Sequence, residues 1–220
     1  EAFMYRYHPQ IIKVIKLIRG NAIGQLISME SFFGMDILTK KNLFGFKKRK
    51  KLNKDSRLYN KDLGGGAILD LGCYPVSISQ LIASLIPDID CNNIKVLNKK
   101  KEIGSTGVDL DSYAELQFDN KFKSKIGASF TKNLGKETRI IGEKGELLIE
   151  STWHGDPSII KIKGEKSYEI NVKCNENIFS YEIRNISKSV LENKKESIYP
   201  GMSLVETLLN MKILDEWLND

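Results

Sequence analysis

The sequence predicts one α+β domain over residues 1–220, built on a large, mainly antiparallel, open β-sheet that helices cover on one face. Two observations indicate this fold class. Apolar and polar residues alternate in one segment after another between positions 109 and 172, as in half-buried strands joined as hairpins. Apolar residues at helical spacing precede these strands and return at residues 178–191 and 204–218, which supplies helices to cover the sheet.

The first part of the chain predicts a strand, a helix, a second strand and a long loop. Residues 1–8 are rich in aromatic side chains and predict the first strand. Pro9 suits the first turn of a helix that Gly20 ends. Residues 23–33 predict the second strand, whereas residues 36–62 lack periodicity and predict a long loop.

The longest apolar helical pattern covers residues 67–86, and Pro87 ends it. Pro75 lies inside this pattern and has no N–H for the carbonyl of Leu71. We therefore expect the helix to bend near Pro75.

Three hairpins and two helices complete the predicted order. The paired segments are residues 109–118 with 122–130, 138–141 with 146–150, and 159–163 with 168–172. Lysines lie opposite acidic residues in the first hairpin, which favours cross-strand pairing. Ser203 and Glu206 predict a capping box at the start of the last helix.

The charge balance argues against a protein that binds polyanions. The formal net charge of +6 is modest, and much of the excess lies in two runs at residues 47–51 and 99–101. No zinc pattern, recognition helix or aromatic platform is evident beside these runs, so solvated loops are expected rather than contacts with nucleic acid or a membrane.

Cysteine and histidine usage predicts no metal site. Three widely spaced cysteines contain no CxxC pair, which argues against a disulfide framework, and two histidines argue against a catalytic transition metal. The sequence shows no secretory signal and no apolar run of the ~18–20 residues that span a bilayer. A cytoplasmic location is therefore expected.

Residues 64–75 are expected to carry the chemistry, because three glycines there run into the apolar helix. Free N–H groups and the positive helix end could face a ligand, which makes Gly65 and Gly66 candidate cofactor-binding residues. Asp70 and Tyr74 are four residues apart, so on a helix the carboxylate could orient the phenol proton. From spacing alone, a dipole-stabilising Asp and an interfacial Tyr without a catalytic role remain an alternative.

Two arginines are candidate substrate-binding residues. Arg57 offers a charged fork beside the glycines, unless it pairs with Asp55 or Asp62. Arg6 is also a candidate, although its position does not distinguish binding from structure.

Trp153 and His154 are candidates for the wall of a substrate site, or alternatively cap a strand end. His8, before Pro9, predicts a hydrogen-bonded structural role. Asp109 and Asp111 alternate along a strand, so they are expected to face solvent and a partner strand.

Residues 64–75, GGGAILDLGCYP, resemble the Asp-x-x-x-His/Tyr segment of the glucose-fructose oxidoreductase, inositol dehydrogenase and MocA (Gfo/Idh/MocA) family. Residues 1–10 resemble the strand by which such chains leave their cofactor domain, and Arg57 lies where many members carry an arginine. Residues 107–109 and 141–147 are similar to recurring family landmarks. The family's N-terminal Rossmann domain, with its Lys-Pro pair, has no counterpart in this sequence.

The resemblance implies the C-terminal, substrate-binding and oligomerisation domain of an oxidoreductase that uses NAD or NADP and acts on a sugar, polyol or related secondary alcohol. Asp70 matches the family Asp. Tyr74 takes the His/Tyr position, as in the dihydrodiol dehydrogenase and glucose-fructose oxidoreductase branches, and would exchange a proton with the substrate oxygen. A family lysine and the cofactor would lower the pKa of this phenol.

The implied partners are the small-molecule substrate, the chain's own N-terminal Rossmann domain, which would hold most of the NAD(P), and further copies against the open sheet face. The fragment alone is expected to be inactive. A non-catalytic binding or assembly module on the same scaffold is the alternative.

Overall fold

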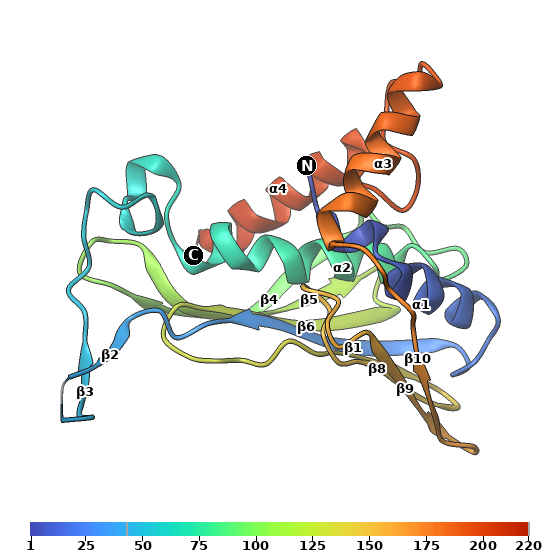
Figure 1. Cartoon of the computed structure of the whole chain (residues 1–220), viewed down its shortest axis with the longest axis horizontal. Coiled ribbons are helices and arrows are strands. Elements are labelled where there is room, and N and C mark those ends of the chain that lie inside the picture. Colours follow the sequence, from blue (N-terminus) through green and yellow to red (C-terminus); the bar gives the residue numbers. More distant parts are fainter. Residues whose placement is uncertain (43, 220) are drawn as a thin grey trace.

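The computed structural model describes residues 1–42 and 44–219, and Figure 1 shows a layer of helices lying on one large sheet. Eight strands form the sheet in the order β10-β9-β8-β7-β1-β6-β5-β4. Strands β1 and β6 run parallel, and every other neighbouring pair described in this sheet is antiparallel. The predicted α+β fold with a mainly antiparallel sheet is therefore confirmed. The strand bounds are β1 Leu26–Gly34, β4 Ile94–Ile103, β5 Asp109–Phe118, β6 Phe122–Ser129, β7 Thr138–Gly142, β8 Gly145–Ile149, β9 Ile159–Gly164 and β10 Tyr168–Asn171.

The α-helices of the described residues lie on the same side of this sheet (Figure 1). They are α1 Pro9–Arg19, α2 Cys73–Ala83, α3 Ile178–Leu191 and α4 Leu204–Leu218. The capping box predicted for the last helix is confirmed, because the Glu206 N–H donates to Ser203 Oγ at 3.2 Å and the Ser203 N–H donates to Glu206 Oε2 at 2.9 Å.

The prediction of a strand at residues 1–8 is wrong. Met4–Tyr7 form a short 3₁₀ helix, in which the Arg6 N–H donates to the Phe3 carbonyl and the His8 N–H to the Tyr5 carbonyl, both at 3.0 Å. Three successive residues, 5–7, are buried because the helical layer surrounds them. Aromatic composition predicts burial, but it does not separate a strand from a tight helical turn.

The predicted loop at residues 36–62 contains a hairpin. Strand β2, Thr39–Lys41, pairs antiparallel with β3, Lys47–Arg49, so part of the first basic run lies on a strand. Two 3₁₀ turns, Arg57–Tyr59 and Lys61–Leu63, then lead to the glycines.

The second basic run, residues 99–101, is also not a loop, because it lies on the edge strand β4. Lys99 Nζ donates to the carbonyls of Glu216 at 3.0 Å and Asn219 at 2.6 Å, and Lys101 Nζ donates to the carbonyl of Leu218 at 2.8 Å. These lysines bind the carbonyl end of α4, where a cation stabilises the helix.

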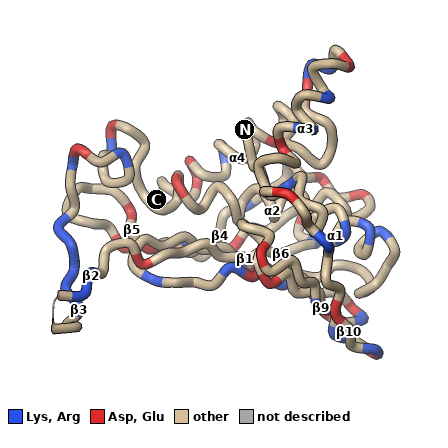
Figure 2. The backbone as a smooth tube through the Cα atoms, viewed as in Figure 1, with Lys and Arg blue, Asp and Glu red and all other residues tan. Residues whose placement is uncertain are grey.

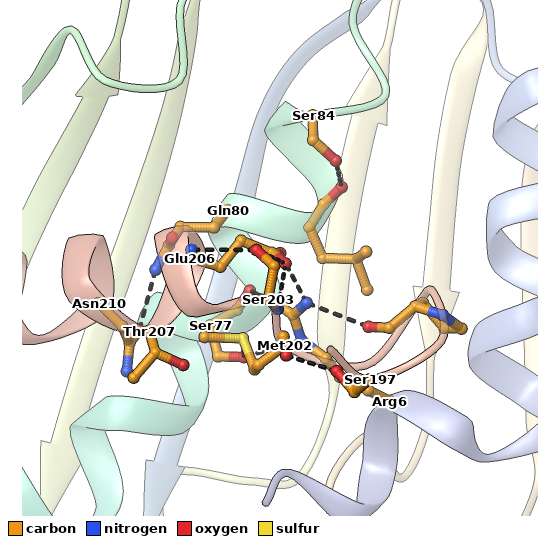
Figure 3. Close-up of polar contacts among 12 residues, drawn as sticks. Arg6, Ser77, Gln80, Ser84, Ser197, Met202, Ser203, Glu206, Thr207 and Asn210 are labelled. Atoms are coloured by element: carbon orange, nitrogen blue, oxygen red, sulfur yellow. Dashed lines mark hydrogen bonds and ion pairs between the residues drawn. The ribbon is translucent and has the colours of Figure 1, made fainter. Parts of the chain in front are cut away.

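A buried arginine connects the helical layer, as Figure 3 shows. Arg6 donates from Nε to Ser77 Oγ at 3.0 Å and from Nη2 to the Ser77 carbonyl at 2.7 Å, both in α2. Its Nη1 donates to the Pro200 carbonyl at 3.1 Å and to the Glu206 carboxylate at 2.8 Å. These partners satisfy a cation whose burial without them would be costly.

The sheet face away from the helices carries charged side chains that form ion pairs. The expected cross-strand pairing is present in Lys123 with Glu115 at 3.3 Å, Lys125 with Glu30 at 3.1 Å, and Lys163 with Glu146 at 2.8 Å. In the middle of this face the rings of Phe32 and Tyr113 lie 6.4 Å apart beside Gly127, where a Cβ atom would come within 2.7 Å of Tyr113.

One helical stretch among the described residues, Lys61–Ala83, is long and apolar enough to cross a membrane by length and composition. This differs from the expectation of no such stretch. In the fold, 78% of its most apolar window is buried, as in the core helix of a globular domain.

We predict that Arg6→Met lowers the free energy of unfolding by about 3–5 kcal/mol, because it leaves the Glu206 carboxylate half-buried without its cation. Arg184→Met is the control, since Arg184 pairs with Glu176 at the surface, where water screens the pair and its loss should leave the free energy of unfolding nearly unchanged. Urea denaturation of both variants measures this. Equal stabilities of the two variants would contradict the role given to Arg6.

Candidate functional site

The glycines before the central helix have no N–H groups free for a ligand. The Gly65 N–H donates to the Asn60 carbonyl at 2.9 Å, and the Gly66 N–H donates to the Leu58 carbonyl at 3.0 Å. Both glycines are buried, and a Cβ on Gly65 would lie 2.7 Å from the Arg57 carbonyl. The prediction of Gly65 and Gly66 as cofactor-binding residues is therefore not supported, because the preceding turns use these donors.

A buried carboxylate occupies the start of the helix. Asp109 Oδ2 accepts from the Ile68 N–H at 2.9 Å and from Ser112 Oγ at 2.9 Å. Its Oδ1 lies where a Cβ on Gly66 would come within 2.2 Å, and Gly66 adopts φ +119°, which favours glycine. Asp109 thus takes the place at the helix N-terminus that an external anion would need.

Asp109 and Asp111 are not directed to solvent as the strand pattern predicts, since both are buried. Asp111 forms an ion pair with Lys132. Burial raises the pKa of Asp109, although the hydrogen bonds from Ile68 and Ser112 act in the opposite direction.

The helix itself begins with an irregular turn. Ile68–Gly72 form a π-helical turn that leads directly into α2 and lies just before Pro75, the residue at which we expected a bend. Gly72 lies against Trp217 of α4, where a Cβ would come within 2.7 Å of the indole. The glycine therefore allows close packing of the two helices at the irregular turn.

Asp70 and Arg57 meet at this turn. Arg57 Nη2 donates to Asp70 Oδ1 at 2.7 Å, while the side chains are 63% and 21% exposed respectively. Arg57 therefore pairs with Asp70, and not with the Asp55 or Asp62 suggested by its sequence neighbourhood. The pair keeps a charged fork at the surface beside the glycines.

Tyr74 is held by other rings. Its ring centroid lies 5.1 Å from Phe3, 5.3 Å from Phe33 and 5.8 Å from Trp153, all in edge-on contacts. Its hydroxyl donates to Met4 Sδ at 4.0 Å, and no hydrogen bond joins it to Asp70 among the described residues. The expected direct orientation of the phenol by Asp70 is therefore absent.

The pKa of Tyr74 is raised to about 12, first by burial and then by the negative charge that Cys73 and Asp70 carry when ionised. This is the opposite of the direction expected for the complete enzyme. The groups expected to lower the pKa, a lysine and a cofactor, are not part of this chain.

Arg6 and Trp153 are interior residues and do not line a site. Arg6 is buried, and its guanidinium donates within the network of Figure 3. The Trp153 indole N–H donates to the Phe32 carbonyl at 3.0 Å. Trp153 instead packs edge-on against the ring of Tyr74. His154 is exposed, whereas His8 has the predicted structural role, because its Nδ1 accepts from the Gln10 N–H at 3.3 Å.

A groove of about 920 Å³ reaches Met4, the residue that the Tyr74 hydroxyl contacts. Met4, which contacts the Tyr74 hydroxyl, lines this groove together with His8, His154 and residues 155–159 and 171–179. Sequence reasoning missed Met4 and residues 171–179, which carry no motif. Among the described residues there is no group of three or more His, Cys, Asp or Glu that could hold a metal ion.

The raised pKa of Asp109 predicts a pH-dependent stability. The folded chain holds this proton more tightly than the unfolded chain, so stability falls as pH rises from the ordinary Asp range through the raised pKa. The unfolding free energy of wild type minus that of Asp109→Asn should therefore fall with rising pH in urea titrations.

Asp119→Asn is the control of opposite sign. Hydrogen bonds from Lys121 and Asn93 lower the pKa of Asp119, so its contribution to stability is lost as pH falls through the folded pKa. The unfolding free energy of wild type minus that of Asp119→Asn should therefore rise with pH. Parallel profiles for wild type and Asp109→Asn would refute the assignment.

Known proteins share both the fold and part of the sequence. The chain is 28% identical over 222 residues to the trans-1,2-dihydrobenzene-1,2-diol dehydrogenase of Xenopus tropicalis, covering 98% of this chain and 60% of that protein. It is 26% identical over 158 residues to a D-xylose 1-dehydrogenase (NADP(+)) of Haloferax volcanii, covering 72% of this chain and 42% of that protein. The chain thus spans about 60% of the length of its first curated relatives.

Solved structures agree in fold. An aldose-aldose oxidoreductase from Caulobacter crescentus complexed with glycerol has a TM-score of 0.76 and 16% identity, over 98% of this chain and 59% of that one. A 3-ketoreductase from Actinomadura kijaniata in complex with TDP-benzene and NADP has a TM-score of 0.71 and 17% identity, with the same coverages. The family model of the GFO/IDH/MocA C-terminal domain matches residues 11–148, more than half of the chain, and the chain therefore belongs to the GFO/IDH/MocA family.

Proposed function

We propose that this chain is the substrate-binding domain of an NAD(P)-dependent oxidoreductase that acts on a sugar, a polyol or a related secondary alcohol. Its family membership and its relatives, which are named as dehydrogenases of a dihydrodiol and of xylose, support this class of reaction. The observation that carries the proposal is the setting of Tyr74, whose ring is fixed by aromatic neighbours while its hydroxyl contacts a thioether beside a groove.

Tyr74 is suited to donate a proton. The phenol is protonated at neutral pH, and the fixed ring holds that proton in one place. Its pKa of about 12 makes it a weaker acid than an ordinary tyrosine, so release of the proton also needs a cation from outside this chain. Met4 Sδ is a weak acceptor, so a substrate oxygen would replace it at little cost. In the direction of alcohol oxidation the phenol must accept a proton, which needs a cation from outside this chain to lower its pKa.

Asp70 and Arg57 are proposed to bind and orient the substrate. Their ion pair lies at the start of the same helix, and the 63% exposed Arg57 side chain can turn toward a hydroxyl or carboxylate. The groove offers His154 and polar residues of the segment 171–177, namely Asn171, Lys173, Asn175 and Asn177, for further hydroxyl groups.

The cofactor is proposed to bind mainly outside this chain. NAD(P) supplies or takes up the hydride when it is bound. The segment at Gly65 and Gly66 does not fit its phosphates, because the donors of both glycines are used and Asp109 occupies the helix start. We assign the cofactor to a Rossmann domain preceding Glu1.

Helices α3 and α4 offer a surface for that domain. Both expose apolar side chains, namely Phe179, Ile183 and Val190 on α3 and Leu204 and Leu208 on α4, each more than half exposed. The Glu1 amino group lies 3.5 Å from Thr207 Oγ1 of α4, so a preceding domain would begin beside this surface. Docking there would cover the apolar side chains and bring a cofactor near the Tyr74 groove.

Tyr74→Phe in the full-length protein tests the catalytic role. The change removes one oxygen and keeps the ring contacts, so kcat should fall by about 10²–10⁴ while cofactor affinity changes little. Steady-state kinetics and the melting temperature should be measured on the same preparation.

Tyr168→Phe is the matched control, because Tyr168 is a half-exposed residue of β10 far along the sheet order from β1. It should leave kcat unchanged. Unchanged turnover in Tyr74→Phe would remove Tyr74 from the mechanism and leave a structural role worth about 1 kcal/mol.

Because the cofactor is assigned to another domain, we predict that the 220-residue chain alone does not bind it. Titration with NADH and with NADPH, followed by calorimetry, should show no saturable binding in the micromolar range, because Gly65 and Gly66 present no free N–H groups. Stoichiometric micromolar binding would contradict the assignment of the cofactor to another domain.

We further propose that the open sheet face joins copies of the chain into a homo-oligomer. Phe32 and Tyr113 form an aromatic centre surrounded by paired charges on this face. Light scattering should show a dimer or tetramer, and Tyr113→Lys should shift it toward monomer by replacing the aromatic ring with a second cation beside Lys132. A monomer at high protein concentration would contradict this proposal.

A further inference from the structure

The hairpin of β2 and β3 projects from the fold and contacts β4 at its base, where Arg49 lies 3.6 Å from Glu102. Figure 1 shows it hanging from one end of the sheet, on the side away from the helices. We call residues 39–51 the basic hairpin. Its described residues 40–42 and 44–51 are all exposed. At its base the Lys50 N–H donates to the carbonyl of the buried Leu38 at 2.8 Å, so the hairpin is anchored at one end.

The basic hairpin concentrates positive charge. Residues 37–54 contain eight Lys or Arg and no Asp or Glu, and Figure 2 shows the cations along β2 and β3. In the strand register, Lys40 faces Lys48 and Lys41 faces Lys47. Like charges directly opposite each other destabilise a strand pair, and a two-stranded hairpin is marginally stable by itself. An anionic partner would relieve this repulsion.

Two phenylalanines form the tip. Phe44 is 83% exposed and Phe46 is 72% exposed. The Asn42 Oδ1 accepts from the N–H groups of both residues, at 3.1 Å and 2.8 Å, and Gly45 between them adopts φ +81°. These contacts fix the turn with both residues away from the core. The expectation of a solvated loop rests on the lack of an aromatic platform, and the two rings supply one.

We propose that the basic hairpin docks on an anionic phospholipid bilayer. The apolar rings lie at the extremity and the cations lie behind them along both strands, so the rings would enter the headgroup region while the cations meet the lipid phosphates. Each cation near an anionic membrane surface adds to affinity, and exposed aromatic rings favour the interface.

Nucleic acid and a second copy of the chain match these features less well. Single-stranded nucleic acid is bound where rings alternate with cations along a groove, whereas here both rings are at the end of the hairpin. A second copy carries a formal net charge of +6, and acidic residues on its open sheet face already pair with lysines.

Vesicle cosedimentation of the full-length protein tests the proposal. Protein should sediment with vesicles of phosphatidylcholine and phosphatidylserine, and not with phosphatidylcholine alone, and binding should weaken as salt is added. Phe44→Ser/Phe46→Ser and Lys47→Gln/Lys48→Gln should each reduce partitioning by about tenfold or more. Lys13→Gln/Lys16→Gln removes the same charge from α1, away from the basic hairpin and from the open sheet face, and should change partitioning less than about twofold.

A fluorescence readout reports insertion directly. Trp153 and Trp217 are fully buried, so the emission of an indole introduced by Phe44→Trp can be followed against a constant background. Its emission should shift to the blue with phosphatidylserine vesicles. The proposal is overturned if no vesicle type binds or both bind equally. It is also overturned if single-stranded RNA binds more tightly than the vesicles, or if Phe44→Ser/Phe46→Ser changes the oligomeric state by light scattering.

Discussion

The hydrogen bond from the Ile68 N–H to the buried Asp109 carboxylate determines how the rest of the site can be built. It ties the first turn of the central helix to β5, and it requires Gly66, because any side chain there would meet the same carboxylate. With the helix start fixed to the sheet, Asp70 and Tyr74 project from a rigid element. The same bond closes the helix N-terminus to external anions, so the glycine segment serves the fold and not a phosphate.

The aromatic cluster around Tyr74 adds a second constraint. Phe3, Phe33 and Trp153 come from three distant parts of the sequence and meet the phenol edge-on. Such contacts fix a ring without using its hydroxyl, and they also exclude water, which raises the pKa of the phenol. The chain therefore fixes the ring of Tyr74 and keeps its phenol protonated at neutral pH, which are two conditions that the proposed role as a proton donor requires.

Local patterns in the sequence predict most elements of this fold. They fail where contacts between distant segments determine how a side chain is paired or buried. Period-two alternation identifies the three hairpins, and the spacing of Ser203 and Glu206 identifies the last capping box. The pairing of Arg57 with Asp70 and the burial of Asp109 depend on segments brought together by the sheet, which no local spacing encodes. Arg6 shows the same limit, because an arginine in a sequence gives no sign that a serine carbonyl and a glutamate will enclose it.

The parallel pairing of β1 with β6 has a consequence for how the chain folds. In the sheet, Ser28 is the neighbour of Lys123, although the two are far apart in the sequence, and β1 separates the β7–β10 hairpins from the β4–β6 meander. Contacts between such distant segments close a long loop and form late, whereas the hairpins on either side are local. Strand β1 is synthesised before β6 and can pair with it only once β6 has emerged, and this pairing joins the two halves of the sheet.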